Sequence, residues 1–434
     1  MPPVDSKTPL FGTDSIGTAF SWRTSLRNAD IREIEGRDGF YIDRIKVRTV
    51  DGVEEESSPS FGGNGGDAYS WKVPEGEYIA KIIYRQGSWL DHVVFVTNRG
   101  THSPQFGGNG GAGPFEYELP ENTRLNGIYG FHDVYVRGLG FYYSRFEKLT
   151  RKTPEFGNPN LGQAFDWKTT LKNAEIREIS GRDGFYIDQI KVRTVDGNQE
   201  ESSPSIGGDG GSPYTWTVPE GEYIAKLEYR QGDWLDGVTF ITNAGTRSPQ
   251  FGGNGGTGPF EFVLPADTRL DGIYGHRDQY VRGLGFYYSV FVKASQKTPE
   301  FGNPNLGQAF EWKTKLKNAD IREISGRDGF YIDRIKVRAV DGAEEESSPS
   351  FGGDGGSPYT WTVPEGEYIA KLEYRQGDWL DGVTFITNAG TRSPQFGGNG
   401  GTGPFEFSLP STTRLTGFYG HKDQYIRGLG FYYR

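Results

Sequence analysis

The chain repeats one sequence unit three times, at an interval of 145 residues. The three copies of one aspartate are Asp43, Asp188 and Asp333. A unit of this size can bury a hydrophobic core of its own. We therefore expect the 434 residues to fold as three domains, at 8–146, 153–291 and 298–434.

The glycine and aromatic content indicates a β-protein. The chain has 65 glycines, and aromatic residues make up 15% of it, which is typical of short aromatic-rich strands joined by glycine turns. Runs such as YIDQIKVRTV (186–195) and WLDGVTFITN (234–243) show the alternation or the β-branched content of strands. The sequence shows no convincing helical periodicity. The fold class predicted from the residues is all-β.

Each unit also contains a shorter repeat of about 45 to 50 residues. In the middle unit, glycine-rich segments begin at Phe156, Ile206 and Phe251. Each sub-repeat can supply one antiparallel sheet of about four strands, and three sheets can bury their inner faces against one another as a prism. Residues 144–153 and 289–298 join the units and are not Gly/Ser-rich, so we expect restricted motion between the domains.

Composition excludes several function classes. The formal charge of −10 and the pI near 5.2 argue against nucleic-acid binding, which needs concentrated basic residues. The absence of cysteine excludes disulfides and thiol catalysis. No apolar run approaches the ~18 residues of a membrane span, and the start MPPVDSKTPLFG lacks the apolar region of a signal peptide. We expect a soluble protein, cytoplasmic or non-classically secreted, without membrane insertion.

Two motifs in each unit share the pattern Gly-x-aromatic-aliphatic-Asp. In the first unit they read GFYID (39–43) and GSWLD (87–91). The glycine permits a tight turn that can direct backbone N–H groups and the carboxylate toward one point. Amides donate hydrogen bonds and a carboxylate accepts them, whereas vicinal sugar hydroxyls do both. The aromatic residue offers a flat apolar wall to the C–H face of a sugar.

A glycine-rich loop accompanies each of these motifs. It reads FGGNGG at 61–66 and at 106–111, and it allows close approach of the backbone. A lone Gly-x-x-x-Asp is usually a turn before a strand, and a lone glycine loop can be a hairpin connection. Six motifs in register with six loops favour binding sites. Repeating a weak site in linked modules favours multivalent binding over catalysis.

The combined motif set resembles the jacalin-related lectins over nearly the whole of the three units. In the second unit it comprises GGDGG, GEYIAKLEYRQGDWLDGVTFITNAGT, FGGNGG and GIYGHRDQYVRGLGFYY. The layout of three sub-repeats is similar to that of the griffithsin-like members of this family. The resemblance implies three tandem β-prism I domains, each with three four-stranded sheets in pseudo-threefold symmetry. It also implies metal-independent carbohydrate binding, with no cofactor and no catalytic residue.

The resemblance further implies which residues bind the sugar. In the family the Asp binds the 4- and 6-hydroxyls, the two residues before it donate backbone amides, and the last glycine of a GG loop donates another. The corresponding residues here are Tyr41, Ile42, Asp43, Gly66, Trp89, Leu90, Asp91, Gly111, Tyr186, Ile187, Asp188, Gly211, Trp234, Leu235, Asp236, Gly256, Tyr331, Ile332, Asp333, Gly356, Trp379, Leu380, Asp381 and Gly401.

The third motif of each unit departs from the pattern. Its aspartate is replaced by Arg137, Arg282 or Arg427, and its glycine by Asp133, Asp278 or Asp423. The facing loop reads GTDSIG or GNPNLG and has lost its paired glycines. We therefore expect sugar binding to be lost there. The Arg–Asp pair can bind an acidic sugar or lock the loop as a salt bridge, and we favour the lock.

Other functions have weaker support. A glycosidase needs two carboxyl groups about 5 to 10 Å apart, whereas each motif offers one, and neighbours such as Asp183 and Asp233 are expected to face water. His132, His276 and His421 fall at the third motif without a serine motif beside them, so we expect a structural hydrogen bond there. Calcium would need several oxygen ligands at alternating positions. A structural or pore-forming module is a further alternative.

Glycan preference rests on the resemblance. The family divides into mannose/glucose and galactose binders, and the galactose branch typically uses a free amino-terminal glycine made by processing. An unprocessed chain with internal GGxGG loops favours mannose. The expected partners are mannose-containing glycans, above all high-mannose N-glycans, on glycoproteins or cell surfaces, with agglutination as a result. A galactose-type or acidic-glycan lectin is the alternative, and the sequence leaves a homo-oligomer open.

Overall fold

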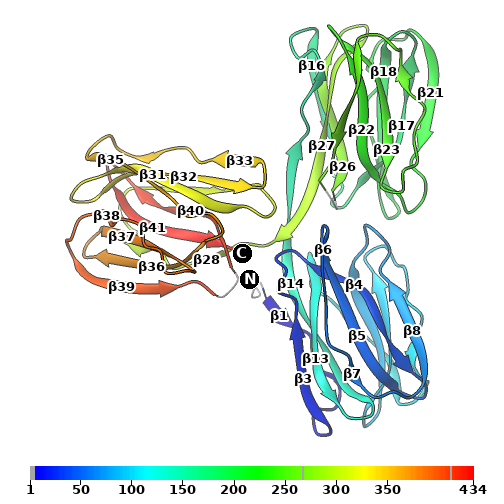
Figure 1. Cartoon of the computed structure of the whole chain (residues 1–434). Helices are drawn as coiled ribbons and strands as arrows, with labels where there is room; N and C mark the ends of the chain where they lie inside the picture. The colour runs from blue at the N-terminus through cyan, green and yellow to red at the C-terminus, as the bar shows by residue number, and fades with distance from the viewer. Residues whose placement is uncertain (1–4, 266–267, 411–412) are drawn as a thin grey trace. The chain divides into compact units, whose positions relative to one another are not determined.

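The computed structural model describes residues 5–265, 268–410 and 413–434, and its regular elements are all β-strands (Figure 1). The chain divides into two compact units, one formed by Lys7–Val292 and the other containing Lys293–Arg434. In these described ranges there is no helix long and apolar enough to cross a membrane. The predicted all-β class is confirmed.

The first repeat contains strands β1 to β14. They are β1 (Asp5–Lys7), β2 (Phe11–Gly12), β3 (Thr18–Arg23), β4 (Asp30–Asp38), β5 (Ile42–Asp51), β6 (Glu54–Ser57), β7 (Phe61–Gly62), β8 (Asp67–Lys72), β9 (Ile79–Gln86), β10 (Leu90–Thr97), β11 (Phe106–Gly107), β12 (Ala112–Glu118), β13 (Thr123–His132) and β14 (Val136–Lys152). Two sheets have the orders β6-β5-β4-β8 and β11-β10-β9-β12, with β7 paired to β5. In the third, β13 lies between β3 and β14, and β2 pairs with β14.

The second repeat has the same arrangement. Its strands are β15 (Phe156–Gly157), β16 (Gln163–Lys168), β17 (Glu175–Asp183), β18 (Ile187–Asp196), β19 (Gln199–Ser202), β20 (Ile206–Gly207), β21 (Ser212–Thr217), β22 (Ile224–Gln231), β23 (Leu235–Thr242), β24 (Phe251–Gly252), β25 (Thr257–Val263), β26 (Arg269–Arg277) and β27 (Val281–Lys293). Two sheets run β19-β18-β17-β21 and β24-β23-β22-β25, and β26 lies between β16 and β27 in the third.

The third repeat forms three separate sheets. Its strands are β28 (Gln296–Lys297), β29 (Phe301–Gly302), β30 (Gln308–Lys313), β31 (Asp320–Asp328), β32 (Ile332–Asp341), β33 (Glu344–Ser347), β34 (Phe351–Gly352), β35 (Ser357–Thr362), β36 (Ile369–Gln376), β37 (Leu380–Thr387), β38 (Phe396–Gly397), β39 (Thr402–Ser408), β40 (Leu415–Lys422) and β41 (Ile426–Tyr433). The sheet orders are β28-β41-β40-β30, β33-β32-β31-β35 and β38-β37-β36-β39.

The segment that joins the first two repeats is part of a strand. β14 continues through it to Lys152 and pairs with β27, so one nine-stranded sheet includes strands of both repeats. The join is not a free linker, because Phe146 of β14 is almost fully buried, as are Val290 and Val292 at the end of the neighbouring strand β27. Burial of these side chains favours strand over loop.

Strand formation follows the alternation of the sequence. Along β5, Ile45 and Val47 are completely buried, whereas Lys46 and Arg48 between and after them point outward. The outward side chains face acids on the neighbouring strand, with Lys46 Nζ 3.2 Å from Glu35. One face of the sheet therefore packs inward while the other is stabilised by cross-strand pairs.

Each repeat has a hydrophobic core of its own, to which all three of its sheets contribute. In the first repeat Phe95 of β10 meets Phe141 of β14 edge to face, with ring centroids 5.5 Å apart. The same contact is made by Phe240 and Phe286 at 5.7 Å. Three sheets around a shared core make the prism that the sub-repeats predicted.

Candidate functional site

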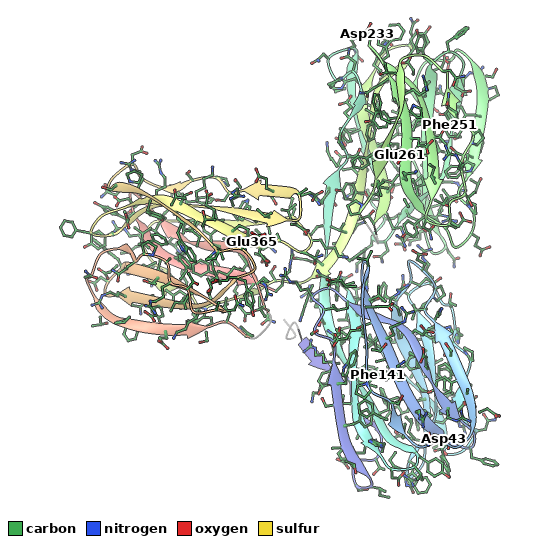
Figure 2. All side chains as sticks on the ribbon, in the orientation of Figure 1. Asp43, Phe141, Asp233, Phe251, Glu261 and Glu365 are labelled. Carbon is green, nitrogen blue, oxygen red and sulfur yellow. The ribbon has the colours of Figure 1, made fainter. Side chains whose placement is uncertain are left out.

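The first two motifs of each repeat form the same turn at the start of a strand. Gly39–Asp43 connects β4 to β5, and Gly87–Asp91 connects β9 to β10. The N–H of Gly39 donates to the carbonyl of Tyr41 at 2.9 Å, and the corresponding bond in the second motif is 3.0 Å. Figure 2 shows Asp43 at one end of the strands of the first repeat, whereas Phe141 lies in its interior. The motifs therefore lie at an end of the prism.

The motif aspartates are held in cradles of glycine backbone. Asp43 is only 6% exposed, and a Cβ added at Gly65 would lie 2.2 Å from its Oδ1. Gly66 has a φ of 61°, and a Cβ there would lie 2.2 Å from the carbonyl oxygen of Asp38. A side chain is thus excluded by contact at both glycines, and at Gly66 by backbone conformation as well. The other five sites have the same cradle, around Asp91, Asp188, Asp236, Asp333 and Asp381.

Backbone donors lie beside the carboxylate. The N–H groups of Phe40 and Tyr41 donate to no protein acceptor within the described residues, so both are available to a ligand. Ile42 is different, because its side chain is completely buried and it opens β5 opposite Asp38. Only its backbone could therefore contact a sugar, and Leu90 of the second motif is in the same position.

The motif aromatics pack against one another. The ring of Tyr41 lies 5.1 Å from that of Trp89 and 5.4 Å from that of Tyr135. One face of Trp89 is covered by the guanidinium of Arg137, at 3.8 Å. That face cannot be the apolar wall for a sugar that the sequence suggested, because an arginine already occupies it.

The solvent-facing aromatic of the site is one that the sequence reasoning missed. Phe40, at the tip of the first motif, is 90% exposed, and Phe185 and Phe330 match it at 87% and 89%. The second motif carries Ser88, Asp233 or Asp378 at this position. The signal was present in the sequence, since the same large apolar residue stands at a turn tip in every repeat.

In each site the guanidinium of one arginine donates hydrogen bonds to two successive carbonyls of the glycine loop, an arrangement called the arginine fork below. The sequence analysis did not predict it. Arg37 donates from Nε to the carbonyl of Gly65 at 2.8 Å and from Nη2 to that of Gly66 at 2.7 Å. Arg85 makes the equivalent bonds to Gly110 and Gly111, at 3.0 and 2.9 Å. The same fork recurs at Arg182, Arg230, Arg327 and Arg375. Its sequence signal is an arginine two residues before the motif glycine.

The acid before the first motif links it to the neighbouring loop. Asp38 accepts a hydrogen bond from the N–H of Gly107 at 2.6 Å. Asp183 does the same for Gly252 at 2.8 Å and is half-buried, so the expectation that it faces water is wrong for Asp183. Asp233 is exposed, as expected.

The environment disfavours ionisation of the first-motif aspartates. Burial raises the pKa of Asp43, the charge of Asp38 raises it further, and Arg37 lowers it. Asp188 and Asp333 have raised pKa values for the same reasons. In the second motif, burial raises the pKa of Asp236, while the N–H of Gly232 lowers it. A ligand that donates hydrogen bonds would stabilise these carboxylates.

The third motif keeps the turn but pairs its arginine and one of its backbone amides with its own aspartate, while Nη1 of Arg137, Arg282 and Arg427 has no hydrogen-bond partner within the described residues. Arg137 Nη2 lies 2.8 Å from Asp133, which forms the expected ion pair. Asp133 also accepts the N–H of Tyr135 at 2.9 Å, which is the amide that stays free in the other two motifs. The same two contacts occur at Asp278 and at Asp423.

The histidines near this motif need one correction. His276 and His421 bond to Glu155 and Glu300, both at 2.8 Å, as a structural role predicts. His132 is one position further along the chain and corresponds to Arg277 of the second repeat. Its ring nitrogen lies 3.4 Å from the carbonyl oxygen of Asp133, and its ring packs near those of Phe20 and Phe61. No group of three or more potential metal ligands occurs within the described ranges.

Comparison with known proteins gives a consistent result. The chain matches the Jacalin-like lectin domain at residues 8–142, 154–287 and 298–432. A mannose/glucose-specific lectin of Parkia pendula is 24% identical over 401 residues, which are 83% of this chain and 83% of that protein. Griffithsin of Griffithsia sp. is 34% identical over 115 residues, 26% of this chain and 84% of its own. A solved banana lectin is 23% identical with a TM-score of 0.28, over 32% of this chain and 99% of the lectin. The family matches agree with three tandem β-prism I domains.

Proposed function

The chain belongs to the jacalin-like lectin domain family and is a carbohydrate-binding lectin, not an enzyme; from this premise we propose that it binds mannose-containing glycans multivalently, without a metal. We propose two working sites in each domain and six in the chain. We also propose domain boundaries at 8–146, 153–291 and 298–434.

One observation carries the proposal: an almost buried carboxylate lies beside unpaired backbone N–H groups in six near-identical copies. The carboxylate can accept hydrogen bonds from two sugar hydroxyls, and the amides can donate to the same hydroxyls. No cation is needed to match this donor and acceptor pattern. Each working site combines the aspartate, the amides of the residues before it and the last glycine of the loop, as assigned from the sequence.

Mannose is favoured over the alternatives by two points. The relative from Parkia pendula is named as a mannose/glucose-specific lectin, and the sites here use internal glycine loops instead of a chain end. An acidic sugar would need a free cation, whereas Arg137 is already paired with Asp133 and stacked on Trp89. High-mannose N-glycans on glycoproteins or cell surfaces are the proposed partners, and agglutination is the proposed outcome.

Phe40 adds a further contact in the first-motif site. Its ring projects into solvent next to the donor amides, where it can lie against the apolar face of the next sugar of an oligosaccharide. Ser88 offers no such surface in the second-motif site. The two sites of one domain are therefore proposed to differ in their response to longer glycans.

Titration calorimetry of the full chain with methyl α-mannoside, methyl α-galactoside and sialic acid tests the proposal. We expect millimolar binding of the mannoside, about 4 kcal/mol per site, unchanged by excess EDTA. Tighter binding of galactoside or sialic acid would favour the alternatives, and loss of binding in EDTA would require a metal site.

A further inference from the structure

The six arginine forks are the strongest feature that the proposed function leaves unused. Each arginine bonds to two successive carbonyls of a loop whose glycines have wide conformational freedom. A flexible loop would lose entropy on binding a ligand, and an ordered one has already lost it. The forks therefore act on the part of the site that most needs to be held.

The bond to the first carbonyl also fixes a donor. The peptide unit is planar and trans, so the C=O of Gly65 and the N–H of Gly66 belong to one rigid plane and point in opposite directions. When Arg37 holds that oxygen at 2.8 Å, the orientation of the Gly66 N–H is set as well. In the second motif Arg85 sets the Gly111 N–H by holding the oxygen of Gly110 at 3.0 Å.

The guanidinium has a second effect, through its charge. The charged residues that shift the pKa of the Asp188 carboxylate are Arg182 and Asp183 on β17. Asp209 lies in the glycine loop and contacts Gln189. Burial and Asp183 raise the pKa of Asp188, and Arg182 acts against them. Loss of the positive charge would therefore leave the carboxylate more easily protonated.

The third motif provides an internal comparison. In the third motif, Asp133, Asp278 or Asp423 stands at the position of the motif glycine. The residue two positions before it is Phe131, His276 or His421, where the other two motifs have arginine. This is also the motif whose facing loop has lost its glycines. Arginine and glycine loop occur together at six sites and are absent together at three, which fits a shared role better than a role in general folding.

We propose that Arg37, Arg85, Arg182, Arg230, Arg327 and Arg375 are positioning residues that hold the donor amide of each glycine loop toward the bound sugar. The proposal rests on the proposed function, because it assigns a role within the same sites. A lysine would keep the charge but could not form the planar two-bonded fork. Lysine and glutamine variants therefore separate the positioning effect from the charge effect.

The test uses the full chain with the second-motif sites disabled by Asp91→Ala, Asp236→Ala and Asp381→Ala. In this parent, Arg37, Arg182 and Arg327 are changed together to Gln or together to Lys. Methyl α-mannoside affinity is measured by calorimetry from pH 7.5 to 4, and hydrogen exchange of the loop peptides is followed by mass spectrometry. The control is Arg48→Gln, Arg193→Gln and Arg338→Gln, which removes three arginines that pair with acids on the same sheets.

Both variants should bind at least tenfold more weakly at pH 7.5, with faster exchange in the loop peptides. Only the Gln variant should also lose binding at a higher pH than the parent, whereas the control should match the parent throughout. Unchanged affinity together with unchanged loop exchange in the Gln variant would overturn the proposal. If the parent failed to bind the mannoside, the proposed function would fall, and the exchange data would still decide whether the arginines order the loops.

Discussion

The first and third motifs of a domain have the same backbone turn, but they differ in whether the amides of the turn are bonded to the protein. In the first, the glycine N–H bonds to the Tyr41 carbonyl at 2.9 Å and the next amides stay free. In the third, the N–H of Asp133 makes the same bond to Tyr135 at 3.0 Å, but the Asp133 side chain then takes the Tyr135 amide. The comparison teaches that the turn alone does not make a site. A site needs an acceptor with an open position and donor amides that the protein leaves unpaired.

The largest expected effect comes from removing the acceptor. Alanine at the six motif aspartates should lower mannoside affinity more than 100-fold, because each lost carboxylate leaves hydroxyls and amides unpaired at about 1 to 3 kcal/mol per hydrogen bond. Binding by nuclear magnetic resonance titration measures the loss. Residual binding close to wild type would place working sites at the third motifs and break the comparison.

Avidity gives the next largest effect. The excised third domain, residues 293–434, has its own core and should keep the monosaccharide affinity of the full chain. It should bind a high-mannose glycoprotein about 100-fold more weakly, because four of the six proposed sites are gone. Surface plasmon resonance on an immobilised glycoprotein measures this. Equal affinity would contradict multivalency as the reason for the triplication.

Acidification should switch the first-motif sites off. Only the ionised carboxylate offers both of its oxygens as acceptors to sugar hydroxyls, and the pKa values of Asp43, Asp188 and Asp333 are raised, chiefly by burial. Affinity should fall about tenfold per pH unit below the folded-state pKa, starting above the ordinary value near 3.9. Calorimetry on the Asp91→Ala, Asp236→Ala, Asp381→Ala chain measures the profile.

The same shift has a consequence for folding. A folded-state pKa above the unfolded value means that the folded state binds protons more tightly, so stability falls as pH rises from the unfolded through the folded pKa. Asp43→Asn, Asp188→Asn and Asp333→Asn should therefore raise stability at pH 7 by about 0.5 kcal/mol per site and give no gain at pH 3. Thermal melts at the two pH values provide the check, and an equal gain at both would exclude the ionisation effect.

Reversing the third motif should not create a site. Arg282→Asp removes the ion pair with Asp278 and the stacking on Trp234, and it brings two carboxylates together. We expect unfolding to become easier by about 1 to 3 kcal/mol with no gain in mannoside binding. Differential scanning calorimetry and a mannose-soaked crystal test this. Sugar density beside Asp278 in the variant would show that Arg282 by itself prevents sugar binding at the third motif.

The smallest effect concerns the tip residue. Phe40→Ser, Phe185→Ser and Phe330→Ser give the first motif the tip that Ser88 gives the second motif. Methyl mannoside affinity should stay constant, whereas a mannobiose should bind about three- to fivefold more weakly, in line with an exposed aromatic contact of about 0.5 to 1 kcal/mol. Equal loss for both ligands would point to a change in the turn instead.

The sequence alone predicted the repeat, the all-β class and the prism, because alternation and glycine spacing are local signals. It also placed the aspartates and glycines that the structure brings together, such as Asp43 with Gly66. It did not predict the fork of Arg37, since an arginine before a turn is normally a solvated charge and its partners lie 28 and 29 residues away. The covered face of Trp89 was missed for the same reason, because Arg137 reaches it only through the fold.

The residue at the tip of each motif turn is exposed, and this affects which substitutions the protein tolerates. Phe40 and Val134 are 90% and 62% exposed, and their backbones, not their side chains, contact the neighbouring loops. A substitution at a tip therefore alters what the surface offers without disturbing the frame beneath it. Nine such positions in one chain form a set of independently adjustable contacts, on which selection or a designer can act one at a time.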